Sequence, residues 1–414
     1  PMYCEMLSDF TTPMETLRML KDVSTHCYLL ESARADETWG RYTFLGFDPK
    51  MELTCINGEM KVGDLTFRTD QPSVYIRRVL DAYKSPRLEG LPPFTGGFVG
   101  YFSYDYVGYA EPCIKRTVQD TEQFKDVDLM LFDRVIAFDH VRQKIILIVN
   151  ISLNDIDTGY NHGMMQLRQL CDLIRNGKKK REDGGKIKGE ITPLFDRKSF
   201  CEMVKKAKAH IHEGDIFQIV LSNRFSAPFS GSLLNTYRVL RTINPSPYMF
   251  YFSGTDVEVA GASPETLVKL ENDVLSTFPL AGTKPRGKTP AEDEQRQQQL
   301  LHDEKELAEH DMLVDLGRND LGKISKFGTV RVEQLHQIER FSHVMHIGST
   351  VRGEIREDCD ALDAIQAVLP AGTLSGAPKI RACQLIAEME NNKRGIYGGA
   401  IGYQRTCYLF RRAV

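Results

Sequence analysis

The feature that most constrains the fold is a series of short, closely spaced apolar runs in the first 150 residues. They lie at 26–32, 42–47, 129–132, 135–138 and 144–149, and each ends at a polar residue or a glycine. Each run has the length of a β-strand. Connections this short favour antiparallel pairing, because parallel strands need a long crossover. The N-terminal part is therefore predicted to be mainly antiparallel sheet with some helices.

A charged, glycine-containing stretch at 177–193 interrupts this pattern. Its first ten residues, Gly177 to Lys186, show no apolar periodicity. Such a composition is typical of a linker. We therefore expect an N-terminal region at 1–176, a linker at 177–193 and a C-terminal region at 194–414.

The C-terminal region mixes strands and helices. Apolar residues recur at helical spacing over 197–213, and a strand-like run follows at 216–221. A polar helix is expected over 294–316, and another over 377–390. The predicted fold class is therefore α/β, of the α+β type.

Composition excludes several classes of protein. The 414 residues carry 53 Lys plus Arg against 56 Asp plus Glu, a net charge of -3, which argues against a broad basic surface for nucleic acid. No apolar run approaches the ~18 residues of a membrane helix, and the N-terminus lacks the features of a signal peptide. The nine cysteines are scattered without any C-x-x-C, as expected of reduced thiols in the cytoplasm.

Two carboxylates in the segment 303–315 are the strongest local candidates for chemistry. If this segment is helical, Glu306 and Glu309 are three residues apart and share a face. Two carboxylates in one cleft could hold Mg²⁺, which prefers few carboxylates together with water and substrate oxygens. The alternative is a solvated charged helix, which periodicity alone favours.

Two segments rich in small residues could bind a ligand. At 279–287, small residues would let a ligand approach the backbone, and Thr283 offers a hydroxyl; a tight turn is the alternative. At 371–379, free N–H groups before a helix would attract an anion, and Ser375 as a plain N-cap is the alternative. The spacing does not match a Walker loop.

A histidine, His346, lies in a strand-like run at 341–348. A lone strand histidine is usually structural, although it could act as an acid or a base. From the residues alone, the prediction is a Mg²⁺-dependent enzyme acting on a small anionic substrate.

These motifs and several others, in this order, resemble the chorismate-utilising enzymes, and specifically their anthranilate synthase component I branch. The resemblance runs from about residue 25 to residue 403. The matching segments are Trp39-Gly40-Arg41-Tyr42-Thr43-Phe44, Gly96-Gly97-Phe98-Val99-Gly100-Tyr101, Phe217-Gln218-Ile219-Val220-Leu221-Ser222, Gly261-Ala262-Ser263-Pro264-Glu265, Ala281-Gly282-Thr283, Glu306-Leu307-Ala308-Glu309-His310 and Gly372-Thr373-Leu374-Ser375-Gly376-Ala377-Pro378-Lys379.

The resemblance implies a fold and an activity. The fold is a chorismate-binding enzyme sandwich, with two antiparallel β-sheets packed together and helices outside. The activity is that of a Mg²⁺-dependent lyase, which converts chorismate and ammonia into anthranilate and pyruvate in tryptophan biosynthesis. Ammonia comes from glutamine through an amidotransferase partner (component II), which implies a hetero-oligomer.

Two positions distinguish the branches of the resembled family. Isochorismate-forming and salicylate-forming relatives have a Lys where Gln218 stands, as a general base for water, so Gln218 favours ammonia as the nucleophile. Aminodeoxychorismate synthases have a nucleophilic Lys where Ala281 stands, and alanine cannot supply that amine.

The resemblance also assigns site residues. A catalytic role falls to His346, which is implicated in turnover, to Glu265 and to Thr283. The Mg²⁺ ligands are Glu309 and Glu306. The substrate-binding residues are Gly282, Thr283, Thr373, Tyr397 and Arg411. The residues that bind tryptophan as a feedback inhibitor are Glu31, Ser32, Pro247, Tyr248, Met249, Tyr403 and Cys407.

The chain departs from the family pattern after Tyr403. A glycine loop and a final Mg²⁺-binding Glu are expected there, and the residues at 404–414 contain no counterpart of either. A truncated or altered C-terminus, with impaired activity, is therefore expected. Two alternatives to the main hypothesis stay open: an aminodeoxyisochorismate synthase that lacks pyruvate elimination, and an impaired remnant that binds tryptophan and the partner.

Overall fold

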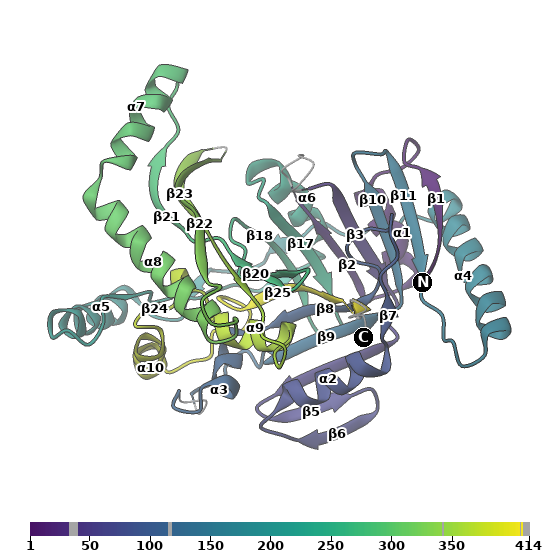
Figure 1. Cartoon of the computed structure of the whole chain (residues 1–414), viewed down its shortest axis with the longest axis horizontal. Coiled ribbons are helices and arrows are strands. Elements are labelled where there is room, and N and C mark those ends of the chain that lie inside the picture. Colours follow the sequence, from purple (N-terminus) through teal and green to yellow (C-terminus); the bar gives the residue numbers. More distant parts are fainter. Residues whose placement is uncertain (33–39, 115–117, 342, 406, 409–414) are drawn as a thin grey trace.

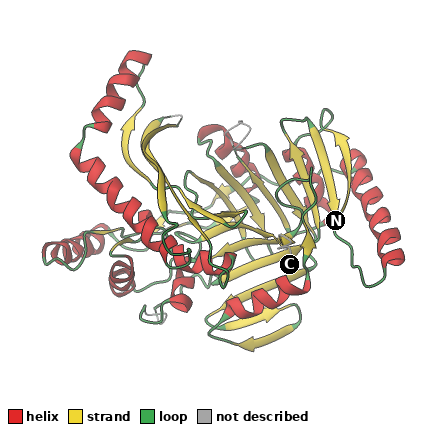
Figure 2. Cartoon of the chain, in the orientation of Figure 1, coloured by secondary structure: helices red, strands yellow, loops and turns green. Residues whose placement is uncertain are grey.

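The computed structural model describes residues 1–32, 40–114, 118–341, 343–405 and 407–408. Its strands form layered sheets with helices on the outer faces (Figure 1). Figure 2 shows helices lying beside the sheets. Along the chain, helices and strands alternate irregularly, as expected of an α+β fold. None of the helices in these ranges combines the length and apolar character that crossing a bilayer requires.

Within the described residues, the first sheet has seven antiparallel strands, which confirms the pairing predicted for the N-terminal runs. In spatial order they are β1 (Met2–Leu7), β11 (Lys144–Val149), β10 (Arg134–Asp139), β3 (Tyr42–Phe47), β2 (Cys27–Glu31), β17 (Tyr248–Ser253) and β18 (Glu258–Ser263). Strand β17 belongs to the C-terminal region, and its Tyr251 lies opposite Leu29 of β2. The two regions of the sequence therefore share one sheet.

The second sheet has six antiparallel strands in the described part of the chain. They are β25 (Ala400–Arg405), β8 (Gly97–Phe102), β9 (Val127–Phe132), β4 (Met51–Ile56), β5 (Glu59–Val62) and β6 (Leu65–Arg68). An aromatic core joins the two sheets, with the rings of Tyr28 and Phe132 edge to face at 4.7 Å between centroids. The predicted packing of two antiparallel sheets is confirmed.

Amphipathic helices cover the outer faces. The first sheet is covered by α1 (Pro13–Val23), α4 (Ile156–Asn176) and α6 (Leu233–Ile243). The second is covered by α2 (Pro72–Ala82) and α9 (Ala361–Val368). Buried leucines such as Leu17 and Leu167 lie on the sheet-facing sides of α1 and α4. Burial of these apolar stripes holds the helices in place.

A third sheet, which the sequence did not predict, lies beside the sandwich. Its strands among the described residues are β19 (Lys269–Glu271), β20 (Val274–Thr277), β21 (Leu280–Pro285), β22 (Arg331–Arg340) and β23 (Val344–Glu354). Strand β23 is long enough to pair with β21 and then β20 along one edge, and with β22 along the other. This sheet and its helices carry most of the candidate site.

The polar segment predicted as one helix over 294–316 forms two. They are α7 (Pro290–Leu301) and α8 (Glu304–Gly322). The side chain of Asp303 accepts a hydrogen bond from the Glu306 N–H and so caps α8. A fresh N-cap starts a new helix at this point, because it satisfies backbone donors that a continuous helix would not leave free.

The remaining elements are two longer helices, α5 (Arg197–His212) and α10 (Lys379–Glu390), and several short helices and strands. The short ones are η1 (Tyr104–Tyr106), α3 (Val107–Ala110), η2 (Gly372–Leu374), and the pairs β12 (Lys186–Ile187) with β16 (Phe229–Ser230), β13 (Thr192–Pro193) with β15 (Phe225–Ser226), β14 (Gln218–Ile219) with β24 (Gly376–Ala377), and β7 (Ser85–Pro86) with β26 (Cys407–Tyr408).

Two local predictions about these elements were wrong. The run at 216–221 is a strand only at β14. Pro378, not Ser375, is the N-cap of α10, because the Ser375 hydroxyl donates instead to the carbonyl of Ala371 at 2.8 Å.

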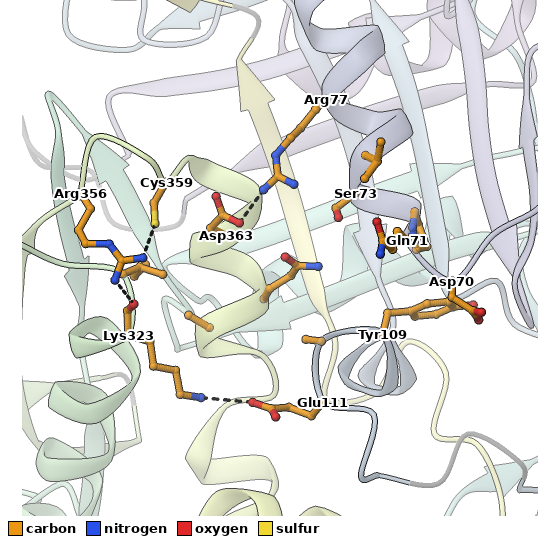
Figure 3. A pocket seen from close by; sticks show the side chains of 16 residues that line it. Asp70, Gln71, Ser73, Arg77, Tyr109, Glu111, Lys323, Arg356, Cys359 and Asp363 are labelled. Atoms are coloured by element: carbon orange, nitrogen blue, oxygen red, sulfur yellow. Dashed lines mark hydrogen bonds and ion pairs between the residues drawn. The ribbon is translucent and has the colours of Figure 1, made fainter.

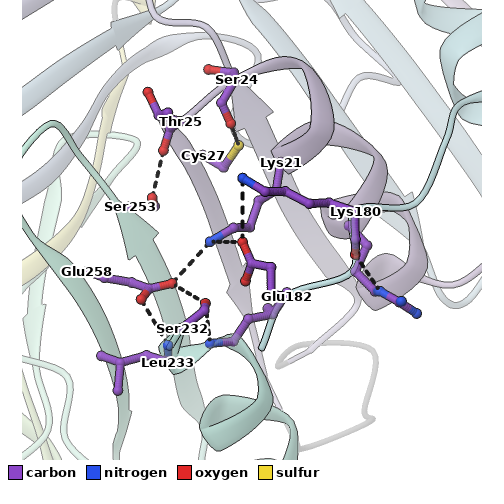
Figure 4. Close-up of polar contacts among 12 residues, drawn as sticks. Lys21, Ser24, Thr25, Cys27, Lys180, Glu182, Ser232, Leu233, Ser253 and Glu258 are labelled. Carbon is purple, nitrogen blue, oxygen red and sulfur yellow. Dashed lines mark hydrogen bonds and ion pairs between the residues drawn. The ribbon is translucent and has the colours of Figure 1, made fainter. Parts of the chain in front are cut away.

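The charged stretch at 177–193 contacts both regions of the sequence. Glu182 forms an ion pair of 3.0 Å with Lys21 of α1, and Lys21 forms a second with Glu258 of β18 (Figure 4). Glu258 also accepts hydrogen bonds from Ser232 and from the Leu233 N–H at the start of α6. The division of the chain at this stretch stays a prediction.

Gly100 of β8 lies where the backbones of β8 and β9 in the second sheet come very close together. Its φ is 155°, and an added Cβ would lie 2.0 Å from the carbonyl oxygen of Asp128. We expect Gly100→Ala to lower the free energy of unfolding by about 2–3 kcal/mol, since the backbone must move to relieve the contact. Denaturant unfolding would measure the loss.

The matched control is Gly402→Ala, because Gly402 lies directly opposite Gly100 on β25 with nothing within 4 Å of an added Cβ. This change is expected to alter stability by less than about 0.5 kcal/mol. Equal losses in both variants would show that the close backbone approach at Gly100 is not the cause.

Candidate active site

Helix α8 presents two carboxylates toward neighbouring elements. Glu306 Oε2 accepts the backbone N–H of Thr283 at 3.1 Å, and Glu309 Oε1 accepts the side-chain amide of Gln218 at 3.2 Å. Both glutamates are partly exposed. The structure thus brings Glu306, Glu309, Thr283 and Gln218 together, although they come from three separate segments.

A bulge in β21 makes the contact between Thr283 and Glu306 possible. The pairing of β21 with β23 shifts register between Ala281 and Thr283, and Gly282 has a φ of 77°. Only glycine adopts this conformation without a steric penalty. A Cβ on Gly282 would also lie 3.0 Å from Ile347 and 3.4 Å from the Glu306 Cβ.

His346 of β23 completes this group. Its Nδ1 lies 3.0 Å from the Thr283 hydroxyl and 3.2 Å from the carbonyl oxygen of Gly282. A carbonyl only accepts hydrogen bonds, so the Gly282 contact places the proton of the neutral ring on Nδ1 and leaves Nε2 as an acceptor. Burial lowers the pKa of His346 below its ordinary value of 6.5, which favours the neutral ring.

Glu265 and Thr373 form a second contact. The Thr373 hydroxyl, in η2, donates to Glu265 Oε2 at 2.6 Å. Burial raises the pKa of Glu265, and the Thr373 bond opposes this only in part. Segment η2 packs closely on α8, because a Cβ on Gly372 would lie 2.2 Å from Leu316.

Arg394, a residue that the sequence reasoning missed, lies between Tyr397 and the segment that carries Thr373. The Arg394 guanidinium forms a buried ion pair with Glu390 and donates to the carbonyl of Leu374 at 2.7 Å. It lies 5.9 Å from the centroid of the Tyr397 ring, which is half exposed. Arg394 therefore fixes the backbone next to Thr373.

The Lys379 ammonium at the start of α10 already has partners within the protein. Lys379 is buried, and its ammonium donates to Asp320 of α8 at 2.6 Å and to the carbonyl of Val368 at 2.7 Å. Burial lowers the pKa of Lys379. The lysine links α10 to α8, and its charge is compensated within the protein.

His310 is a further residue that the sequence reasoning did not single out. Its side chain is completely buried on α8, and Nε2 lies 2.6 Å from the hydroxyl of Ser349 on β23. Burial lowers its pKa to about 4. Its place beside Glu309 in the sequence was the signal that could have identified it.

The residues assigned to tryptophan lie at the ends of β2 and β17. Glu31 pairs with Met249 across the two strands, accepts the Tyr237 hydroxyl at 2.6 Å, and forms an ion pair with Arg241 of α6. Tyr248 hydrogen-bonds Thr266. The further residues of this set, Ser32 and Pro247, follow β2 and precede β17 in the chain.

Tyr403 lies on the opposite face, between the two sheets. Its ring contacts those of Phe94, at 4.6 Å between centroids, and Phe44, at 5.8 Å. The face occupied by Met249 packs instead against the helices. Arg411 and the side chain of Cys407 lie outside the described residues.

Other candidate sites hold none of the predicted residues. A cavity of about 470 Å³ lies between α2, α3 and α9 (Figure 3). Its cations are compensated, since Arg77 pairs with Asp363 and Lys323 with Glu111. Among the described residues, the one group of three possible metal ligands is His210, Glu213 and Asp215, on an exposed surface.

Gly282→Ala tests the bulge. We expect a loss of about 2–3 kcal/mol in the free energy of unfolding, from left-handed strain plus the contacts with Ile347 and Glu306. The matched control is Gly328→Ala, where φ is 76° but nothing lies within 4 Å of an added Cβ. That variant carries strain alone, about 1 kcal/mol. Equal losses in denaturant unfolding would contradict tight packing at Gly282.

Comparisons with known proteins identify the relatives of this chain. The family model for chorismate binding enzymes matches residues 25–406. Anthranilate synthase component 1 from Acetivibrio thermocellus is 42% identical over 415 residues, which cover 97% of this chain and 84% of that protein. The corresponding protein from Aquifex aeolicus is 42% identical over 421 residues, covering 97% and 83%.

Solved structures show the same fold. Anthranilate synthase component I from Streptococcus pneumoniae matches with a TM-score of 0.78 and 35% identity, covering 89% of this chain and 81% of that one. The menaquinone-specific isochorismate synthase from Escherichia coli shares the fold at a TM-score of 0.71 and 16% identity, covering 98% and 82%. The chain therefore belongs to the chorismate binding enzyme family, within its group of anthranilate synthase component 1 proteins.

Proposed function

We propose that this chain converts chorismate and ammonia into anthranilate and pyruvate, as the large component of an anthranilate synthase in tryptophan biosynthesis. The observation that carries the proposal is the contact of Glu306 with the Gly282–Thr283 bulge, beside His346 and the Gln218–Glu309 pair. The names of the relatives support the same activity. Ammonia would come from glutamine through a partner subunit, and the assembly would work in the cytoplasm.

The donor set fits Mg²⁺. Glu306 and Glu309 offer anionic oxygens on one helix face, and among the described residues each accepts a hydrogen bond from a neutral amide and has no cationic partner. Mg²⁺ usually takes one or two carboxylates, with water and substrate oxygens for the rest. When bound, the ion would neutralise and orient the ring carboxylate of chorismate.

Other residues of the site would bind the substrate and transfer a proton. The dianionic substrate would be held by the open backbone at Gly282, by the hydroxyls of Thr283 and Thr373, and by Tyr397. Ammonia attacks the ring as the hydroxyl leaves, and loss of pyruvate then makes the ring aromatic. The unprotonated Nε2 of His346 is suited to take the ring proton in that elimination.

Two positions support ammonia rather than water as the nucleophile. The Gln218 amide donates to Glu309, so this side chain is a hydrogen-bonding group and not a base for water. Ala281 is buried and has no nucleophile. Both observations disfavour the isochorismate and aminodeoxychorismate reactions.

Tryptophan would act as a feedback inhibitor at the ends of β2 and β17. The carboxylate of Glu31 could receive the amino group of the ligand, in exchange for part of its pairing with Arg241. Because β2 and β17 come from different regions of the sequence, a ligand there could shift how the regions pack.

Anthranilate fluorescence tests the proposal. With chorismate, Mg²⁺ and ammonium, we expect the purified chain to form anthranilate at the impaired rate that its altered C-terminus predicts. Glu309→Gln should lower kcat/KM by about a further 100-fold, through loss of a metal ligand. The control is Asp315→Asn, an exposed change on the same helix, which is expected to stay within about twofold.

Other outcomes would identify the alternatives. A non-aromatic amino product in mass spectrometry would indicate an aminodeoxyisochorismate synthase. Calorimetric binding of tryptophan without any consumption of chorismate would indicate an impaired remnant, and would contradict the proposed activity.

The pH profile tests His346. Since burial lowers its pKa, the neutral ring prevails above pH 6.5, and kcat/KM should fall only as the pH drops through the lowered pKa, below 6.5. His346→Asn should lower kcat by about 100-fold or more and remove that acidic limb. An unchanged limb in the variant would assign it to another group.

A further inference from the structure

One buried hydroxyl connects three elements of the candidate site. Ser349 of β23 is 4% exposed, and its Oγ lies 2.6 Å from Nε2 of His310 on α8. The same oxygen accepts the backbone N–H of His336 on β22 at 3.1 Å. The side chain of His310 is itself fully buried. Helix α8 is thus tied to both strands at the turn that carries the carboxylates.

The helix that carries His310 also packs against β21. Within the described residues, no group hydrogen-bonds Nδ1 of this imidazole. In β21, Ala281 directly precedes the bulge at Gly282. The imidazole is therefore packed between the helix that carries Glu306 and Glu309 and the strands that carry Thr283 and His346.

Because of the position of His310 along α8, its contacts affect where both carboxylates point. Glu306 and His310 are four residues apart and share a face, and Glu309 is the adjacent residue. Because carboxylates project roughly 6 Å from the helix axis, a rotation of about 20° would move them by roughly 2 Å. Mg²⁺ tolerates little displacement, since it requires near-ideal geometry at short distances.

Two other polar contacts of α8 are either exposed or far from the carboxylates, unlike the contact of His310 with Ser349. Asp311 meets His336 at 2.7 Å, but its side chain is more than half exposed. The buried pair of Asp320 with Lys379 lies about three helical turns further along. At the turn of the carboxylates, the buried polar contact is that of His310 with Ser349.

We propose that His310 is a positioning residue, which fixes the rotation of α8 through Ser349 and so directs Glu306 and Glu309 toward one divalent cation. The proposal rests on the proposed function for the identity of that cation. It predicts that loss of the His310 contact weakens metal binding more than it weakens folding.

The experiment measures Mn²⁺ binding by electron paramagnetic resonance, with chorismate present and ammonia absent so that no turnover occurs. We expect His310→Leu and Ser349→Ala to raise the dissociation constant by about 10-fold or more, as outer-shell changes do. His310→Gln, which can still place an amide near Ser349, should stay within about threefold of the wild type.

Arg318→Ala is the matched control, because within the described part of the chain Arg318 makes one ion pair, an exposed one with Asp315 on the same helix. It should bind Mn²⁺ within about twofold of the wild type. Thermal unfolding of each variant identifies any loss of fold. In the activity assay, the Mg²⁺ concentration for half-maximal rate should follow the same order.

The outcomes separate this inference from the proposed function. Wild-type affinity for Mn²⁺ in folded His310→Leu or Ser349→Ala would overturn the inference and leave the function intact. If His310→Leu does not fold, Ser349→Ala and His310→Gln decide by the same criterion. A chain that binds Mn²⁺ in the expected order but forms no anthranilate would overturn only the function, and a wild type without Mn²⁺ binding would overturn the inference.

Discussion

The rest of the structure depends on the pairing of β2 with β17. One strand comes from the N-terminal region and the other from the C-terminal region, and their hydrogen bonds run from Cys27 opposite Ser253 to Glu31 opposite Met249. Without β17 and β18, the edge of β2 would be unpaired and the aromatic face of the sheet would lose Phe252. The pairing therefore makes one sandwich of two regions that a charged stretch separates in the sequence.

A buried charge network reinforces the same junction. Lys21 lies between Glu182 and Glu258, and Glu258 also accepts the Leu233 N–H at the start of α6 (Figure 4). Removing one member would leave an uncompensated buried charge, which costs far more than the pair itself contributes. The network thus specifies how the helices and the charged stretch meet, more than it stabilises the fold.

The candidate site depends on a different constraint, the close fit of α8 against β21 and β23. The bulge at Gly282 turns the Thr283 N–H toward Glu306. The buried contact of His310 with Ser349 joins the helix to β23. A site made of separate segments keeps its geometry only if such buried contacts fix the elements that carry it. Gly282, which stood out in the sequence, and His310, which did not, therefore belong to the same arrangement.

The sequence predicted much of this site but not its assembly. The spacing of Glu306 and Glu309 placed both on one helix face, and the small residues around Gly282 marked an open backbone, because these are local properties of a few neighbouring residues. It could not predict the split between α7 and α8, where the choice between a continuous helix and a new cap depends on what Asp303 contacts. The alternative that it offered for Ser375, a plain N-cap, was wrong, since serine hydroxyls have several local acceptors.

By itself, the sequence determined the antiparallel N-terminal strands, the family and the identity of the candidate site residues, since all of these are recorded in short-range patterns and motif order. Only the tertiary structure decided the third sheet, the shared edge of β2 and β17, and the burial of His310, Lys21 and Arg394. The physical reason is that these features depend on contacts between residues far apart in the sequence, such as Leu29 with Tyr251 and His310 with Ser349. Their energies come from packing and from the exclusion of water, which no local pattern of residues encodes.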